Sequence, residues 1–144
     1  MKKLLTLLLA CSVLGLSASP ALAQHKLKLL WKTADLPTPE SVLVIVEDDT
    51  TFLYVSLIDG AGDAVDGKGG VAKLAANGAI IDKDWISGLN APKGMATYKN
   101  RLYVADLTEV VVIDMEEQKV IKKIPVEGSV FLNDVTVNSS GVIF

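Results

Sequence analysis

The sequence predicts an all-β fold: a partial β-propeller of four-stranded antiparallel blades. A strand–turn–strand pattern occurs three times, in residues 39–57, 91–106 and 131–144. Leu53, Leu102 and Val142 hold the same place in the three copies and lie 49 and 40 residues apart. A period of about 40–50 residues is typical of propeller blades. No window of the chain shows helical periodicity, which agrees with an all-β fold.

The three copies amount to about two and a half blades of an expected six. This number cannot close a ring, and the last predicted strand runs to Phe144 without a terminal cap. We therefore expect the chain to be the N-terminal part of a longer propeller, an incomplete fragment.

Residues 1–23 are predicted to be a signal peptide. Met1-Lys2-Lys3 is basic, Leu4–Leu16 is mostly apolar, and Ala21-Leu22-Ala23 is a small-residue cleavage site. This pattern predicts a periplasmic or secreted protein in which residues 24–144 form the propeller domain and no transmembrane segment remains. The alternative is a lipoprotein with lipidated Cys11.

The charge of the exported chain argues against nucleic acid as a partner. Loss of Lys2 and Lys3 would leave 12 of the 14 basic residues against 17 acidic ones. No basic cluster interleaved with aromatic residues occurs, as a nucleic-acid surface would need. Cys11 is the only cysteine, so the exported chain would contain neither a disulfide nor a thiol.

Alternating and continuous apolar runs predict the strands of the first blade. Gln24–Trp31 alternates and is predicted to pair with a distant blade. The four strands of the first blade are expected at residues 41–46, 52–57, 71–75 and 79–85. Asp59–Gly70 is rich in glycine and aspartate and is expected to be a loop. Asn77-Gly78 predicts a two-residue hairpin turn with positive φ at both positions.

The second blade is predicted in the same way. Its strands are expected at residues 94–98, 101–106, 109–114 and 119–125. Lys122 and Lys123 suit an outer strand that must not pair with other chains. A third inner strand should follow Glu127-Gly128-Ser129.

Several short motifs carry a family resemblance. PESVL followed by LYVSL, GLNAPKGM followed by LYVAD, and FLND together resemble the SMP-30/gluconolactonase-like group of six-bladed propellers. Propellers of the NHL and strictosidine-synthase types share much of this pattern. The resemblance implies a divalent cation, usually Ca²⁺, in a central channel. It implies Glu40 and Asn133 as two metal ligands and an aspartate beyond Phe144 as the third. It also implies that Lys93, which holds the corresponding position in the middle copy, binds substrate.

The residue types at these positions have a physical rationale of their own. Inner strands of a propeller begin at the channel mouth, so residues at their starts converge from different blades. Carboxylate and amide oxygens are hard ligands that suit Ca²⁺. Such an ion can polarise a lactone carbonyl or activate water. The alternative is that Glu40, Lys93 and Asn133 hydrogen-bond strand ends and line a wet channel.

Three possibilities therefore stay open: a metal-dependent lactone or ester hydrolase, a non-catalytic propeller that binds a small molecule or a protein, and a piece that has no activity alone because its ring is incomplete. His25 is the only histidine, which argues against a Ser-His-Asp triad in this chain. The spacing of the aspartates in the 59–70 loop does not match an EF-hand, so a solvated connection is expected there. Structural roles are expected for four further residues: Trp31 and Trp85 in the core, and Asp106 and Asp134 at turns.

Overall fold

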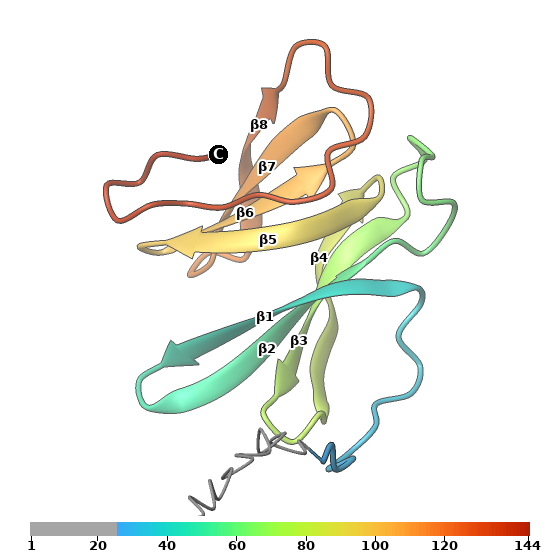
Figure 1. Cartoon of the computed structure of the whole chain (residues 1–144), viewed down its shortest axis with the longest axis vertical. Coiled ribbons are helices and arrows are strands. Elements are labelled where there is room, and N and C mark those ends of the chain that lie inside the picture. Colours follow the sequence, from blue (N-terminus) through green and yellow to red (C-terminus); the bar gives the residue numbers. More distant parts are fainter. Residues whose placement is uncertain (1–25) are drawn as a thin grey trace, which may run out of the picture.

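The computed structural model describes residues 26–144, and the predicted signal peptide lies outside this range. The described chain contains eight β-strands in two four-stranded antiparallel sheets and no helix. The all-β part of the prediction is therefore confirmed (Figure 1). Among these residues there is no helix of the length and apolar character needed to span a membrane.

Each sheet follows the order of its strands along the chain. Sheet 1 has the order β1-β2-β3-β4 and sheet 2 the order β5-β6-β7-β8. The strands are β1 (Pro39–Glu47), β2 (Thr50–Leu57), β3 (Gly69–Ala75), β4 (Ile80–Leu89), β5 (Pro92–Tyr98), β6 (Arg101–Asp106), β7 (Glu109–Asp114) and β8 (Lys119–Pro125).

The two sheets repeat each other in register. The first strand of each begins at a proline, and Pro39 pairs with Leu57 as Pro92 pairs with Asp106. A register shift follows at the same place in both sheets. Pairing resumes two residues beyond Glu40 in β1 and two residues beyond Lys93 in β5. The sequence repeat is therefore also a structural repeat.

Alternation of side chains gives each sheet two apolar faces. We call the face of sheet 2 that carries Met95, Leu102 and Val104 its front, and the face that carries Tyr103 and Ala105 its back. The equivalent front of sheet 1 carries Val42, Leu53 and Val55, and its back carries Tyr54 and Val71.

The front of sheet 2 packs against the back of sheet 1. Tyr54, Val71 and Trp85 of sheet 1 share one buried cluster with Met95 and Leu102 of sheet 2. The rings of Tyr54 and Trp85 meet edge to face, with centroids 4.7 Å apart. The expected core position of Trp85 is confirmed, since its side chain is 4% exposed.

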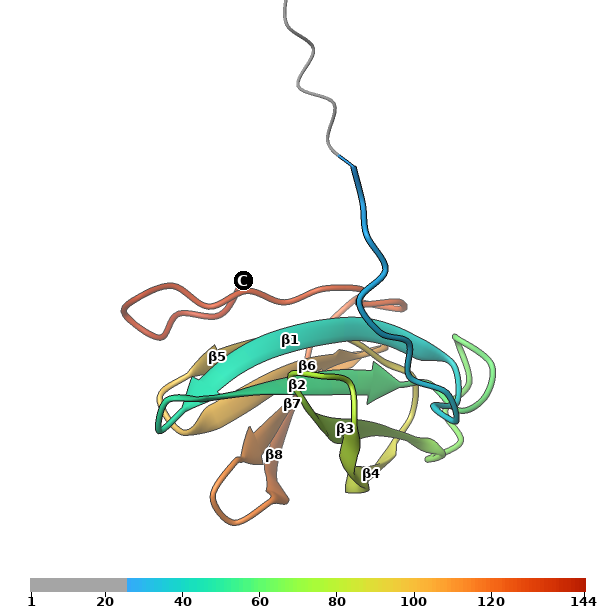
Figure 2. The same cartoon turned by 90° about the horizontal axis from the view of Figure 1, so that it is seen from below.

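The predicted third inner strand is not a regular strand. Residues 131–144 form two isolated bridges, Leu107 to Leu132 and Val137 to Ile143. Backbone hydrogen bonds between Thr136 and Phe144 close a hairpin over residues 136–144, which we call the third hairpin. It has no third strand to extend its ladder. Figures 1 and 2 show this segment running beside β5, where it covers the back of sheet 2.

The predicted N-terminal strand, Gln24–Trp31, is wrong for the part that the structure describes. Residues 26–31 form no ladder, and Leu27 and Leu29 are exposed. Alternation alone cannot make a strand without a neighbour to share its hydrogen bonds. The chain that follows reaches the turn between β3 and β4, where Thr33 Oγ1 donates to Gly78 O at 2.6 Å. Trp31 is 43% exposed, so its expected core position is also wrong.

The turn at Asn77-Gly78 is longer than predicted. Gly78 has a φ of 82°, but Asn77 is not among the residues with positive φ. Gly78 N donates to Ala75 O at 2.9 Å, and Ala75 N donates to Ala79 O at 2.9 Å. These bonds define a three-residue loop with a glycine bulge, which needs only one positive φ.

Five strands, β1 to β5, extend beyond their predicted bounds. β4 runs on to Leu89, four residues past Trp85, through several register shifts. β3 begins at Gly69, so the loop after β2 ends at Lys68 and not at Gly70. Both glycines are buried, since other backbone segments approach them closely. Close backbone approach is a common reason for glycine within a strand.

A candidate ligand site at the start of β1 and β5

The three predicted site residues lie on neighbouring segments. β1, β5 and the start of the 131–144 segment run in the same direction side by side (Figures 1 and 2). Glu40 and Lys93 are each the second residue of their strand. Asn133 follows the bridge at Leu132, and its carbonyl oxygen accepts a hydrogen bond of 3.0 Å from Gly94 N. The structure therefore brings Asn133 to the start of β5. Glu40 lies at the start of β1, in the other sheet.

Glu40 lies on the surface, at the edge of a shallow depression. Its side chain is exposed, and the depression of about 170 Å³ is lined by Glu40 and its neighbours along β1 together with Val55. The backbone beside it is fixed, because Ser41 N donates to the buried Ser56 Oγ at 3.0 Å. The carboxylate is therefore presented to solvent from a rigid strand start.

Lys93 lies inside the protein. Its side chain is 2% exposed. The ammonium donates to Gly62 O at 2.8 Å and to Ala91 O at 2.9 Å. It also lies 4.3 Å from the centroid of the Phe131 ring, an arrangement that attracts a cation to the ring face. Lys93 thus ties the loop after β2 to the start of β5 and to the 131–144 segment. A direct contact with substrate would require these bonds to be exchanged.

Asp106 fixes the chain that leads into β5. Its side chain is fully buried and accepts hydrogen bonds from Asn90 N at 2.9 Å and Ala91 N at 2.8 Å. The expected structural role of Asp106 at a turn is therefore confirmed. Because Ala91 O is also a partner of Lys93, the two buried charged groups hold the same stretch of backbone.

Asp134 packs closely against the backbone of β5. Its Oδ1 accepts a hydrogen bond of 2.8 Å from Val135 N, as expected for a residue at a turn. A methyl group on Gly94 would overlap the Asp134 carboxylate. Gly94 is therefore small because the 131–144 segment, which carries Asn133, lies directly on it.

Two of the predicted site residues carry oxygen atoms of the type that Ca²⁺ binds. Glu40 offers a carboxylate and Asn133 an amide oxygen, and both side chains are exposed. Ca²⁺ takes six to eight oxygen ligands, so water, substrate or other groups would have to supply the rest. Across residues 26–144, no group of three or more His, Cys, Asp or Glu side chains is placed to hold a metal.

The aspartates of the 59–68 loop are exposed. Asp66 accepts hydrogen bonds from Lys68 N at 3.2 Å and from Lys68 Nζ, which is 3.0 Å from Oδ2. The Lys68 side chain is the main cause that lowers the pKa of Asp66. A solvated connection, as expected from the sequence, describes this loop.

A second hollow lies at the other end of β1 and β5, and sequence reasoning missed it. This cavity of about 370 Å³ is lined by the ends of both strands and by the turn after β7, including Glu47, Asp48, Lys99 and Glu116. Its only sequence signal is the repeat itself, which places the β1–β2 and β5–β6 hairpins at equivalent positions.

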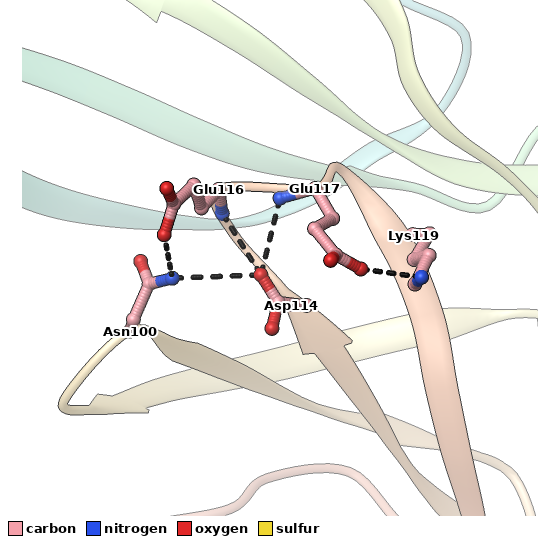
Figure 3. A network of polar contacts seen from close by, with 5 residues as sticks. All are labelled: Asn100, Asp114, Glu116, Glu117 and Lys119. Carbon is pink, nitrogen blue, oxygen red and sulfur yellow. Dashed lines mark hydrogen bonds and ion pairs between the residues drawn. The ribbon is translucent and has the colours of Figure 1, made fainter.

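Glu116, one of the carboxylates that line this second cavity, belongs to a network of hydrogen bonds at the turn after β7. Asn100 Nδ2 donates to Asp114 Oδ1 at 3.4 Å and to Glu116 Oε2 at 3.5 Å (Figure 3). Asp114 Oδ1 also accepts from the backbone N–H groups of Glu116 and Glu117, both at 3.1 Å. Glu117 pairs with Lys119, and this partner raises the pKa of Lys119. The network shapes the β7–β8 turn.

Glu47, on the sheet 1 side of the second cavity, is also engaged. It accepts from Tyr54 Oη at 2.8 Å and from Lys73 Nζ at 3.0 Å. Lys73 Nζ lies 4.0 Å from the centroid of the Phe52 ring. Burial, followed by the hydrogen bond to Glu47, raises the pKa of Tyr54. These contacts hold the end of the β1–β2 hairpin against β3.

Comparison with known proteins adds no relative. No protein-family model matches this sequence, and no curated protein matches it significantly. What the fold and the site define is therefore a class: an all-β protein with two repeated four-stranded sheets that pack front to back.

The buried position of Lys93 leads to a testable expectation. Replacing Lys93 with methionine keeps the apolar stem and removes the ammonium that holds Gly62. We expect amide hydrogen exchange in residues 59–68 to become about tenfold faster, because loss of one charged hydrogen bond costs about 1.5 kcal/mol. Lys68→Met, on the same loop but exposed, is the control and should change exchange little. Equal protection in Lys93→Met and the wild type would show that the tether does not hold the loop.

Proposed function

We propose that this chain is part of an exported β-propeller that binds a small molecule where β1, β5 and the 131–144 segment begin. The specific form of the proposal is a Ca²⁺-dependent lactone or ester hydrolase of the SMP-30/gluconolactonase type. One observation supports it above the others: Glu40 and Lys93 are equivalent in register, and Asn133 lies against the residue that follows Lys93. Repeated sheets thus present chemically different side chains at one repeated position.

Each residue has a separate role in this proposal. Glu40 and Asn133 would hold the cation, which would polarise the lactone or ester carbonyl or activate water. Lys93 would hold the start of β5 in place from inside the protein, since its contacts fix Ala91 and the 59–68 loop. The resemblance implies an aspartate from another sheet as a further ligand.

A second candidate function is ligand binding without catalysis. The contacts of Lys93 favour it, because a buried ammonium occupies the position in β5 that corresponds to Glu40 in β1. A fixed positive charge near a cation site opposes metal binding by Coulomb repulsion. In this second candidate function, the starts of β1 and β5 would bind an uncharged or anionic small molecule.

Calcium titration tests the metal part of the proposal. We expect Ca²⁺, raised to about 10 mM, to stabilise the protein, since cation sites of extracellular modules bind at about 0.1–1 mM. At a hundred times the dissociation constant the gain would be about 2.7 kcal/mol. Thermal unfolding with and without Ca²⁺ measures it. Glu40→Gln should abolish the gain, and Glu127→Gln, an exposed glutamate elsewhere, should keep it.

Turnover separates the two candidates. Proton release from a panel of lactones and esters, followed in a pH-stat, should depend on both Ca²⁺ and Glu40 if the protein is a hydrolase. Binding of a lactone or sugar acid that is measurable by calorimetry, with no proton release, would favour the binding propeller. Absence of stabilisation by Ca²⁺ together with absence of turnover would contradict the hydrolase.

A further inference from the structure

Asn77 and Gly78 lie at the tip of the loop that joins β3 to β4. Asn77 is exposed, whereas Gly78 is buried although it lies in a surface loop. Asn77 is the only one of the five asparagines that is followed by glycine. A glycine nitrogen is not shielded by a Cβ atom, so it can approach the preceding side chain. This pair is therefore the part of the chain best suited to attack of a backbone nitrogen on a side-chain amide.

The conformation of the loop brings the two reacting groups together. Asn77 Oδ1 accepts a hydrogen bond of 3.1 Å from Ala79 N. An Asx turn of this kind folds the amide side chain back towards the peptide between the two residues, which here contains Gly78 N. In the closed loop Gly78 N donates to Ala75 O at 2.9 Å, and it must leave that bond before it can react. The rate of the reaction therefore depends on how often the loop opens.

The N-terminal part of the described chain holds this loop closed. We call residues 31–33 the arm. Thr33 Oγ1 donates to Gly78 O at 2.6 Å, and a methyl group on Gly78 would overlap the Trp31 ring. Figure 1 shows this part of the chain, in blue, beside the turn between β3 and β4. The arm thus covers Gly78, and the loop cannot open without breaking these contacts.

We propose that Asn77 is a deamidation site that the arm protects, and that its modification releases the arm. In the open loop Gly78 N attacks Asn77 Cγ and closes a succinimide ring. The proton of Gly78 N leaves with the side-chain nitrogen as ammonia. Water then opens the ring, and its attack at the main-chain carbonyl of Asn77 gives isoaspartate, whereas attack at the side-chain carbonyl gives aspartate. This proposal does not depend on the proposed calcium site.

The isoaspartate product changes the length of the backbone. Its peptide bond runs through the side chain, which adds one methylene group to the chain at residue 77. Ala75 N donates to Ala79 O at 2.9 Å across the loop, so the added group displaces Gly78. Trp31 and Thr33 then lose the surface on which they lie. The aspartate product keeps the backbone length, so it should leave the arm in place.

Peptide mapping of the protein kept at mildly alkaline pH tests the site and its protection. We expect residue 77 to gain about 1 Da, the difference between an amide and a carboxylic acid, before any other asparagine changes. Thr33→Val removes the hydroxyl that bonds Gly78 O. It should make the reaction about three- to tenfold faster, the effect of one hydrogen bond on an opening equilibrium. Thr33→Ser should restore the wild-type rate. Thr108→Val, at an exposed threonine between β6 and β7, is the control and should react like the wild type.

Tryptophan fluorescence tests the release of the arm. The chain has two tryptophans, and Trp85 is 4% exposed against 43% for Trp31, so quenching by acrylamide reports chiefly on the arm. Protein with isoaspartate at residue 77, separated by chromatography, should be quenched more strongly than fresh protein. Asn77→Asp should be quenched like fresh protein. Earlier deamidation of another asparagine would overturn the proposal. So would equal rates for Thr33→Val and the wild type, or equal quenching of the isoaspartate form and fresh protein.

Discussion

Replacing Asp106 with alanine is expected to lower the free energy of unfolding by about 3–5 kcal/mol. The carboxylate is fully buried and accepts from the N–H groups of Asn90 and Ala91. Hydrogen bonds to a charged group contribute about 1.5–3 kcal/mol each, and the truncation leaves buried donors without a partner. A loss of this size is a large part of the stability of an ordinary domain. Denaturant unfolding followed by circular dichroism measures it.

Two matched variants accompany this measurement. Asp63→Ala removes an exposed carboxylate from the 59–68 loop and should change the free energy of unfolding by less than about 0.5 kcal/mol. Asp106→Asn keeps the shape and one acceptor oxygen, so its loss should fall between those of the other two. If Asp106→Ala were as stable as Asp63→Ala, the two backbone hydrogen bonds would not hold the entry to β5 as described.

Replacing Gly70 with alanine is expected to cost about 3 kcal/mol, the second large effect. Gly70 is buried in β3, where an added methyl group would overlap the carbonyl oxygen of Ile86 in β4. The overlapping atom belongs to the backbone, so β4 would have to move as a whole. Forcing a methyl group into a packed region costs about 1–3 kcal/mol, and an immovable neighbour places this substitution at the upper end.

Gly62→Ala is the control for the Gly70 variant. A methyl group on Gly62 would meet no atom within 4 Å, and its φ is not positive. The unfolding free energy should therefore stay the same or rise slightly, since alanine restricts the unfolded chain. Equal unfolding midpoints for the two variants would contradict the close approach of β3 and β4.

Strand composition and the repeat predicted the all-β character and the grouping of the eight strands into two four-stranded sheets. Leu53-Tyr54-Val55 and Leu102-Tyr103-Val104 mark the second strand of each sheet, because β-branched and aromatic residues suit a pleated, buried surface. Their common position also predicted that Glu40 and Lys93 would correspond, as the pairing confirms. Local patterns are sufficient here because each strand pairs with its neighbour in sequence.

The features that the sequence did not predict depend on distant parts of the chain. Lys93 lies in the short segment Pro92-Lys93-Gly94, where nothing in the local sequence predicts burial. Its ammonium is buried because the fold places Gly62 O and the Phe131 ring beside it. The N-terminal segment alternates like a strand, but pairing is decided by whether a partner edge lies beside it. Trp85 was expected in the core, yet its Nε1 has no hydrogen-bond partner among the described residues.

The front-to-back packing of repeated sheets is the central claim, and nuclear Overhauser effects from the Met95 methyl group test it most directly. Met95 of sheet 2 shares a buried cluster with Tyr54 and Trp85 of sheet 1. With the methionine methyl groups labelled, we predict cross-peaks between Met95 and the aromatic protons of Tyr54 or Trp85. Cross-peaks from Met95 to protons of sheet 2 alone would contradict the packing, and with it the shared strand starts on which the candidate site depends.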